Sequence, residues 1–410
     1  MAENAILLVI GYVWPEPNSS AAGNRMIQLL QLFQQAQYNI VFASAAQKSS
    51  YEYNLADLGI EEKAILLNHS SFDEFLVNLQ PQLVLFDRYF IEEQFGWRIS
   101  KICPKAIKIL DTEDLHFLRH ARQKAWKENR LENISDLQSD YAKREIASIL
   151  RCDTTLVISR YELDLLVNVF KIEANLLFYL PLLIEPHSNT LPAFEERTDF
   201  IFMGNFLHEP NWQAVRYLKE QVWPILGKLL PQVSMQIYGA YPSQKVLQLH
   251  EPKQGFFIQG RATHAAQKVQ EARVSLAPLF FGAGLKGKLL EAMQNGTPSV
   301  TTRVGAEGIE NEDNWPGFIA STPETFAKAA VQLYTNPDSW MQAQNRGFAI
   351  LQTQFRKDLF ADTFIAHITF LREHIVSHRE ANFIGAILQH HTMASTTYLS
   401  RWIEEKSKHV

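Results

Sequence analysis

Short apolar runs alternate with longer helical stretches along most of this 410-residue chain, and this alternation constrains the fold more than any other feature. Such runs, when they lack a polar residue at every second position, are typical of parallel strands buried on both faces. The alternation predicts an α/β protein whose parallel sheets are covered by helices. The expected strands lie near residues 5–11, 38–44, 63–67, 83–87, 106–111, 154–159, 176–180, 199–204, 233–239, 256–259, 274–279, 299–302 and 317–320.

The pattern falls into two halves separated by residues 183–192, which are rich in proline and polar residues and are typical of a linker. A chain of this length is expected to form two domains, each large enough for its own hydrophobic core. Open parallel sheets bind ligands at the carboxyl ends of their strands, so two facing sheets predict a cleft between the domains.

Residues 280–293, Phe-Phe-Gly-Ala-Gly-Leu-Lys-Gly-Lys-Leu-Leu-Glu-Ala-Met, predict a small-residue turn that leads from a strand into a helix beginning at about Gly284. The first turn of a helix offers unpaired N–H groups and a positive dipole, and glycines let phosphate oxygens approach the backbone. Lys286 and Lys288 add positive charge, and Glu291 could accept hydrogen bonds from vicinal hydroxyls. The segment predicts a nucleotide-diphosphate site. The alternative is an ordinary connection with packing glycines and solvated lysines.

This segment resembles the donor-binding motif of the retaining glycosyltransferases of family 4 (group 1), which have two Rossmann-like domains in the GT-B arrangement. Many members carry Gly-x-Gly-x-Lys-x-Lys-x-x-Glu-Ala followed by Gly-x-Pro-Val-Val-x-Thr. The matching positions are Gly282, Gly284, Lys286, Lys288, Glu291, Ala292, Gly296, Pro298, Val300 and Thr302. Further segments resemble the family in the same order along the chain, at residues 109–119, 156–162, 199–211, 237–239, 257–260 and 304–309.

The resemblance implies a donor site on the C-terminal domain for a UDP- or GDP-linked sugar, with no cofactor and no protein-bound metal. The donor-binding residues that it implies are Gly204, Asn205, Asn211, Gly260, Arg261, Gly282, Ala283, Gly284, Leu285, Lys286, Lys288 and Glu291. The nucleotide base is expected near residues 260–261, the ribose on Glu291 and the diphosphate over residues 284–286.

The resemblance places the transfer centre at the end of the strand near 106–111 and implies catalytic roles for Asp111, His116 and Lys286. His116 would hydrogen-bond the donor sugar, whereas its alternative interpretation is a partly buried histidine with satisfied ring nitrogens. Asp111 and Asp114 could instead cap the helix that follows them.

The loop at residues 14–25 follows the first strand and precedes a helix, which predicts that it lies over the cleft on the acceptor side. Asn24, Arg25 and Arg119 are the expected acceptor-side residues. The alternative interpretation of this loop is a capped surface connection.

Two departures from the family pattern bear on function. Ala283 stands where many members have a glutamate that contacts the donor sugar, and Asn205 and His208 stand where many have an arginine and a lysine. The resemblance still implies transfer of a sugar from a nucleotide-diphosphate sugar to a hydroxyl of a glycan, lipid-linked glycan or small molecule, with retention of anomeric configuration. Ala283 motivates the alternative of a catalytically inactive nucleotide-sugar-binding or scaffolding subunit of a polysaccharide assembly complex.

Two other enzyme classes fit less well. The sequence lacks the paired acidic and histidine pattern of a sugar-nucleotide 2-epimerase around the donor loop, and a phosphorylase needs a pyridoxal-phosphate lysine and a much longer chain. In the resembling family a C-terminal helix crosses back to the first domain. The expected division is therefore residues 1–184, with about 372–410, as the acceptor domain and residues 192–371 as the donor domain.

Composition limits the partners and the location. A net charge of −5 without a dominant basic stripe argues against nucleic acid as a partner. Two cysteines, Cys103 and Cys152, predict unpaired thiols in a reducing cytoplasm. We find neither a signal peptide nor the run of about 18 apolar residues that a membrane span requires. We expect a cytoplasmic protein and leave peripheral association with the inner face of the membrane open, because family relatives often use lipid-linked acceptors. The sequence indicates no oligomeric state.

Overall fold

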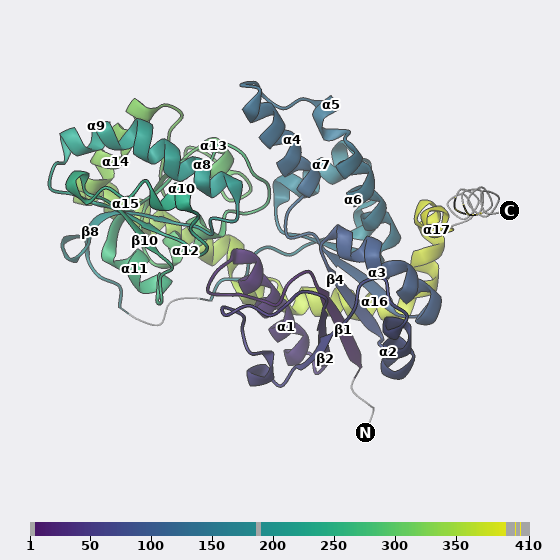
Figure 1. The fold of residues 1–410 in the computed structure, drawn as a ribbon. Helices are drawn as coiled ribbons and strands as arrows, with labels where there is room; N and C mark the ends of the chain where they lie inside the picture. Colours follow the sequence, from purple (N-terminus) through teal and green to yellow (C-terminus); the bar gives the residue numbers. More distant parts are fainter. Residues whose placement is uncertain (1–4, 186–189, 391–397, 399–401, 403–410) are drawn as a thin grey trace.

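Two parallel sheets form two lobes in the computed structural model, which describes residues 5–185, 190–390, Tyr398 and Trp402 (Figure 1). The first sheet has seven strands in the order β3-β2-β1-β4-β5-β6-β7. Their bounds are β1 Ile6–Gly11, β2 Asn39–Ser44, β3 Glu61–Ala64, β4 Leu83–Asp87, β5 Ile107–Asp111, β6 Thr154–Val157 and β7 Leu177–Tyr179.

The second sheet has six strands in the order β10-β9-β8-β11-β12-β13. Their bounds are β8 Thr198–Met203, β9 Met235–Tyr238, β10 Phe256–Gly260, β11 Ala272–Ala277, β12 Ser299–Thr301 and β13 Gly317–Ile319. All strand pairs in both sheets are parallel, for example Leu8 with Val41 in the first sheet and Phe200 with Met235 in the second. Two doubly wound α/β domains result, as predicted from the alternating pattern.

Helices cover both sheets (Figure 1). Those of the first lobe are α1 Ala21–Gln35, α2 Ser71–Leu79, α3 Tyr89–Ile102, α4 His116–Lys127, α5 Ile134–Leu137, α6 Asp140–Arg151 and α7 Arg160–Asn168. Those of the second are α8 Glu209–Tyr217, α9 Trp223–Leu229, α10 Gln244–Leu247, α11 Ala265–Glu271, α12 Gly287–Gln294, α13 Arg303–Ala306, α14 Pro323–Thr335 and α15 Pro337–Ile350. The chain ends with α16 Ala361–Ala381 and α17 Phe383–Gln389. Two π-helical segments, Leu218–Val222 and Leu351–Phe355, extend α8 and α15.

The core lies on both faces of each sheet. In β1, Leu8 and Ile10 pack in one apolar cluster and Leu7 and Val9 pack in another, because successive side chains of a strand point to opposite faces. All four are at most 1% exposed. This explains why the strands appear in the sequence as continuous apolar runs.

The expected strand near 63–67 is wrong in position. β3 is an edge strand at Glu61–Ala64, where Val41 of β2 pairs with Glu61. The apolar run continues past the strand, and Leu66 and Leu67 are 58% and 49% exposed. An edge strand needs little apolar surface, so pairing with β2 rather than hydrophobicity sets its limits.

The C-terminal helix crosses back to the first lobe, as the resemblance implied, and does so earlier than the expected residue 372 (Figure 1). Phe364, Ile368 and Leu371 are buried in the same cluster as β1, so α16 packs on the first domain along most of its length. Further on, Arg379 forms an ion pair with Asp153, with Nε 2.7 Å from Oδ1.

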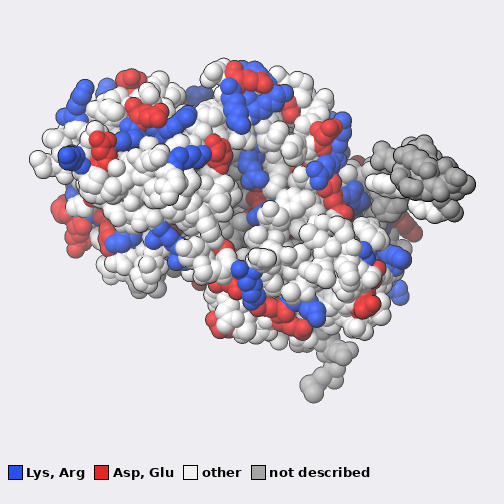
Figure 2. All heavy atoms as spheres, in the orientation of Figure 1, with Lys and Arg blue, Asp and Glu red and all other residues white. Residues whose placement is uncertain are grey.

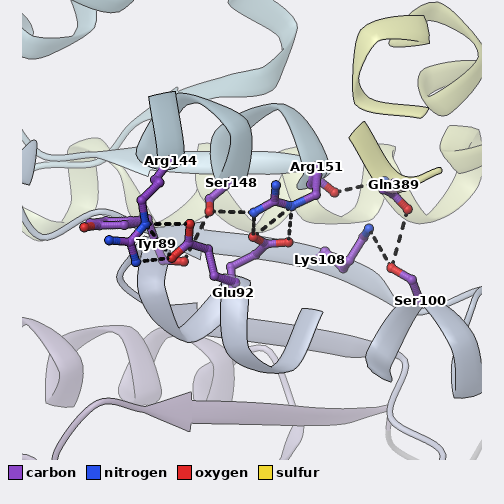
Figure 3. A network of polar contacts seen from close by, with 9 residues as sticks. Tyr89, Glu92, Ser100, Lys108, Arg144, Ser148, Arg151 and Gln389 are labelled. Atoms are coloured by element: carbon purple, nitrogen blue, oxygen red, sulfur yellow. Dashed lines mark hydrogen bonds and ion pairs between the residues drawn. The ribbon is translucent and has the colours of Figure 1, made fainter. Parts of the chain in front are cut away.

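A network of hydrogen bonds and ion pairs connects α17 with the first domain (Figure 3). Arg151 of α6 pairs with the buried Glu92 of α3, and its carbonyl oxygen accepts a hydrogen bond from Nε2 of Gln389 at 3.2 Å. Ser100 bonds to Gln389 at 3.4 Å and accepts from Nζ of Lys108 at 3.2 Å. The network joins α3, α6, β5 and α17.

Within the part of the chain that the structure describes, no helix is long and apolar enough to cross a membrane.

Candidate active site

The candidate site lies where the carboxyl ends of the two sheets face each other. Strand order reverses between β1 and β4 in one sheet and between β8 and β11 in the other, and ligands of open α/β sheets bind at such points. Figure 2 shows a groove between the lobes with basic side chains along part of its wall. The loops after β4, β5, β8 and β11 therefore carry the residues of interest.

On the second domain, Lys288 of α12 contacts β8 and the first turn of α8. Its ammonium group donates to Oδ1 of Asn211 and lies 4.2 Å from the centre of the Phe202 ring. Burial lowers the pKa of Lys288 to about 7. A Cβ added at Gly204 would lie 2.9 Å from this ammonium group, so a larger residue here would displace the side chains of Lys288 and Asn211. The structure brings these predicted donor residues together.

Asn205 continues this cluster toward the first domain. Its carbonyl oxygen accepts from Nδ2 of Asn211 at 2.7 Å, and its own Nδ2 donates to the carbonyl oxygen of Ser19 at 3.3 Å. Glu291, one turn after Lys288 on α12, is half-buried, and burial raises the pKa of its carboxyl while the nearby Lys288 opposes the rise. No described side chain forms a hydrogen bond with this carboxylate.

The helix expected from Gly284 begins at Gly287, so the prediction of its start is wrong by almost one turn. Gly284 adopts a left-handed conformation with φ of +62°, and its N–H donates to Glu162 of the first domain at 2.8 Å. An added Cβ would lie 2.8 Å from Cβ of Asp114. The amide expected to meet a diphosphate is thus bound to a carboxylate, whereas the N–H groups of Lys286, Gly287 and Lys288 have no acceptor among the described residues.

The loop before α12 docks on the first domain. Ala283 is 8% exposed and packs in the apolar cluster of the first domain. Arg122 of α4 donates to the carbonyl oxygen of Gly282 at 3.0 Å and forms a two-point ion pair with Glu307, at 2.6 and 2.7 Å. Lys286 is buried, and its ammonium group donates to the carbonyl oxygen of Gly284 at 2.7 Å. The ammonium group of Lys286, which the sequence predicted to add positive charge at the diphosphate, is thus bound within its own loop.

On the other side of the groove, the turn after β5 carries Asp114, His116 and Arg119. Nε2 of His116 lies 3.4 Å from Oδ1 of Asp114, and both atoms are buried without a hydrogen bond to any described residue. Arg119 binds the second oxygen of Asp114 at 3.0 Å. Burial lowers the pKa of His116 to about 3, so its imidazole is neutral at physiological pH. Nε2 of His116 thus makes no hydrogen bond with a described residue, whereas the alternative interpretation expected satisfied ring nitrogens.

Asp111 and Arg25 lie away from the groove surface and bind each other. Nη2 of Arg25 is 2.8 Å from Oδ1 of Asp111, and the two side chains are 1% and 0% exposed. Nη1 of Arg25 also donates to the carbonyl oxygens of Leu180 and Pro181. The predicted catalytic aspartate and acceptor-side arginine thus form a buried pair that ties β5 and α1 to the segment after β7. Neither reaches a ligand in this conformation.

Arg261 and Asn24 are two further residues that the sequence predicted for the site. Arg261 follows β10, and its guanidinium lies 4.5 Å from the centre of the Tyr51 ring of the first domain. Nε of Arg261 is buried and has no hydrogen-bond partner in the described part of the chain. Asn24 is exposed on α1. Beside Arg261, the hydroxyl of Tyr241 donates to Glu16 at 2.9 Å, which gives a further contact between the domains.

Sequence reasoning missed Arg88 and Glu113 as groove residues. Both are non-glycine residues with positive φ: Arg88, at 75°, directly follows β4, and Glu113, at 60°, lies two residues after β5. Such backbone strain is typical of functional sites. Burial raises the pKa of Glu113 to about 8. Their strain depends on tertiary contacts, such as the Arg88 N–H that donates to the carbonyl oxygen of Asp111 at 2.8 Å, and leaves no sequence signal.

His208 was noted in the sequence only as a departure from the family pattern. It precedes α8, and burial lowers the pKa of its imidazole to about 4, while charges from both domains also act on it. Those charged groups include Arg119 and Asp114 of the first domain and Lys288 of the second. His208 therefore lies between the two halves of the site. Among the described residues, no group of His, Cys, Asp and Glu side chains could hold a metal ion, and both cysteines are buried free thiols.

Comparison with solved protein structures identifies the fold. Sucrose-phosphate synthase from Thermosynechococcus elongatus covers 90% of this chain and 99% of its own, with a TM-score of 0.65 and 14% identity. The pneumococcal O-GlcNAc transferase GtfA, in complex with UDP and GlcNAc, covers 90% and 99%, with a TM-score of 0.68 and 12% identity. This chain has the GT-B fold. WaaG, a glycosyltransferase involved in lipopolysaccharide biosynthesis, covers 87% and 99%, with a TM-score of 0.62 and 11% identity.

Sequence matches to known proteins cover a smaller part of this GT-B chain than the structural matches do. Residues 197–336, which form most of the second domain, match the family described as "Glycosyl transferases group 1". An uncharacterized 44.6 kDa protein in the cps region of Klebsiella pneumoniae is 23% identical over 172 residues. That match spans 40% of this chain and 44% of the relative, so less than half of the relative's length is covered.

Proposed function

We propose that this protein is a glycosyltransferase that moves a sugar from a nucleotide-diphosphate sugar to a hydroxyl acceptor with retention of anomeric configuration. The observation that carries the proposal is a polar pair on each domain, Lys288 with Asn211 on the second and His116 with Asp114 on the first, with charged groups of both domains acting on His208. The match of residues 197–336 to group 1 glycosyltransferases supports the same function.

The donor would bind on the second domain. Glu291 would accept hydrogen bonds from the ribose hydroxyls, and the base would lie near Gly260 and Arg261. The diphosphate would lie near Gly204 and Lys288, beside the free N–H groups at the start of α12. GtfA holds UDP, which supports a UDP-linked donor; a GDP-linked donor is the other candidate.

In the reaction, the bond between the anomeric carbon and the diphosphate oxygen breaks while the acceptor oxygen bonds to the same face of the anomeric carbon. The acceptor proton passes to the departing phosphate, and Lys288 and the helix-end N–H groups stabilise the charge that develops there. Neutral His116 would hydrogen-bond the donor sugar through Nε2, which is unpaired. Arg119 would hold the acceptor. Asp111 and Arg25 would act indirectly, by fixing the backbone that carries His116.

The acceptor class in this proposal is a glycan or lipid-linked glycan, and the reaction would take place in the cytoplasm or at the inner face of the membrane. The role of WaaG in lipopolysaccharide biosynthesis supports a polysaccharide context. Oligomeric state is not part of the proposal.

A second candidate function is a nucleotide-sugar-binding or scaffolding subunit without turnover. The position of Ala283 favours it, because the residue that replaces the usual glutamate packs in the first domain's core instead of facing the groove. Nucleotide binding without turnover across UDP- and GDP-sugars would select this function.

Release of UDP or GDP from a panel of nucleotide sugars, with and without oligosaccharide acceptors, tests the enzyme directly. Nuclear magnetic resonance of the product gives the anomeric configuration, which should equal that of the donor. His116→Gln should abolish most turnover. His120→Gln is the matched control, since His120 lies one turn further along α4, exposed and stacked on Tyr141 at 4.2 Å. Inversion of configuration, or equal loss in both variants, would contradict the proposal.

A further inference from the structure

A single carboxylate oxygen of Glu162 joins the two domains. Glu162 lies on α7 and is 0% exposed. Its Oε1 accepts a hydrogen bond from the N–H of Leu115 at 2.9 Å and from the N–H of Gly284 at 2.8 Å. Leu115 belongs to the first domain, and Gly284 belongs to the loop that follows β11 in the second domain. One acceptor atom thus fixes the distance between these two backbone segments.

Both segments lead directly to candidate site residues. Leu115 precedes His116, the first residue of α4, and Gly284 is two residues before Lys286. The segments also touch without any side chain on Gly284, because a Cβ there would lie only 2.8 Å from Cβ of Asp114. Since packed backbones have no free space between them, displacement of one segment must displace the other.

The hydrogen-bonding capacity of the Glu162 carboxylate is only half used, unlike that of a purely structural buried carboxylate. Its second oxygen, Oε2, is buried without a hydrogen-bond partner among the described residues. Burial raises the pKa of this carboxyl to about 7, which reflects the cost of holding the charge there. A half-satisfied buried carboxylate contributes poorly to stability, so stability alone does not explain it. Local rules are commonly broken in this way at functional sites.

A second carboxylate provides an internal comparison. Glu145 of α6 accepts from the N–H groups of His116 at 3.1 Å and Phe117 at 2.9 Å. It is also 0% exposed, but both of its partners lie in its own domain. Glu145 and Glu162 therefore hold the same end of α4, and of these two carboxylates Glu162 alone also accepts a hydrogen bond from the second domain.

We propose that Glu162 is a positioning residue that couples the His116 end of α4 to the Gly282–Gly284 loop, so that donor-side and acceptor-side groups keep a fixed relative position. The coupling is a property of the chain itself, whereas its consequence for sugar transfer rests on the proposed function. Glu162 touches no reacting atom in this account. It acts through the two amides that it accepts from.

Hydrogen exchange of the full-length protein tests the coupling without any need for turnover. In Glu162→Ala, exchange should quicken at least tenfold at both Leu115 and Gly284, which corresponds to about 1.4 kcal/mol of lost protection. In Glu145→Ala, exchange should quicken at His116 and Phe117 and stay unchanged at Gly284. Faster exchange at Leu115 alone in Glu162→Ala would overturn the proposal.

Two further variants separate geometry from charge and guard against misfolding of the alanine variant. Glu162→Gln keeps an oxygen at the same reach and should retain protection at both amides. Glu162→Asp keeps the charge but is one methylene shorter, so it should lose protection at one amide or both. If both amides stayed protected in Glu162→Asp and lost protection in Glu162→Gln, the charge rather than the bridging oxygen would matter. That result would overturn the proposal.

Steady-state kinetics gives the functional readout. We expect kcat of Glu162→Ala to fall at least tenfold while KM for the donor changes less than about threefold, because binding groups remain and only their relative position is lost. A wild-type protein that turns over no nucleotide sugar but shows the exchange pattern would refute the proposed function and leave the coupling intact. Normal kcat in Glu162→Ala of an active enzyme would refute the positioning role alone.

Discussion

The ammonium groups of Lys286 and Lys288 lie in different surroundings, although only one residue separates them in the sequence. That of Lys286 donates to the carbonyl oxygen of Gly284 within the loop that docks on the first domain. That of Lys288 donates to Asn211 on the donor side of the groove. The two lysines of the motif therefore have separate partners: Lys286 binds within the loop, and Lys288 lies at the proposed diphosphate site.

Lys288→Ala should weaken binding of a nucleoside diphosphate by about 1.5–3 kcal/mol, the usual contribution of a hydrogen bond to a charged group. Titration calorimetry with UDP or GDP measures this loss. Lys286→Ala should lower both the melting temperature and turnover, because Lys286 is buried and supports the loop. If Lys286→Ala weakened nucleotide binding and Lys288→Ala did not, this assignment would be reversed.

Ala283→Glu would introduce the residue that many members of the resembling family have at this position. In this chain, Ala283 packs in the apolar core of the first domain, so the new carboxylate would be buried without a built partner. We expect destabilisation on the order of 3 kcal/mol. Chemical unfolding measures it, with Ala283→Ser as the smaller control. Unchanged stability together with increased turnover would show that the loop is free to face the groove.

Arg25→Met tests whether the Arg25–Asp111 pair is structural. Removal of the guanidinium leaves Asp111 buried and unpaired, and breaking such a pair usually costs about 3–5 kcal/mol. The free energy of unfolding should fall by that amount. Arg119→Met is the comparison: its side chain is 30% exposed, so we expect little change in stability and a raised KM for the acceptor. A stable Arg25→Met with a raised acceptor KM would restore the acceptor-side role predicted from the sequence.

The lowered pKa of His116 should make the stability of the protein depend on pH. Its pKa is about 3 in the folded protein, against about 6.5 for an unperturbed histidine, because burial disfavours the charged ring. Between these values the unfolded chain binds a proton that the folded protein does not, so stability is lost as pH falls below about 6.5. Relative to His116→Gln, the wild type should lose at most about 1.4 kcal/mol per pH unit there. The difference should stay constant above pH 8. A constant difference down to pH 4 would mean that His116 takes up a proton in the folded state.

Most of the fold could be predicted from the sequence, because burial on both faces of a parallel sheet leaves an uninterrupted apolar run. Strands such as β1 and β8 carry that signal, whereas the polar edge strand β3 carries little. The approximate place of α12 followed from its glycines and apolar spacing. Its start did not, since Gly284 is held out of the helix by Glu162, which is 122 residues away in the chain.

The candidate site was predictable where chemistry resides in a local motif. Gly204, Asn211 and Lys288, which the resemblance assigned to one site, lie close together, since motif spacing fixes which strand ends and helix starts they occupy. The pairing of Arg25 with Asp111 and the strain at Arg88 depend on contacts between distant segments. No local pattern of residue types encodes such contacts, so sequence reasoning assigned Arg25 to the acceptor and passed over Arg88.

The most direct test of the account is calorimetric titration of UDP and of GDP into the wild type and into Glu291→Ala. We expect the wild type to bind at least one of these nucleoside diphosphates. The variant should bind it more weakly by about 1.5–3 kcal/mol, because the ribose loses a charged hydrogen-bond acceptor. Failure of the wild type to bind either nucleotide, or equal affinity in the variant, would contradict a donor site on α12.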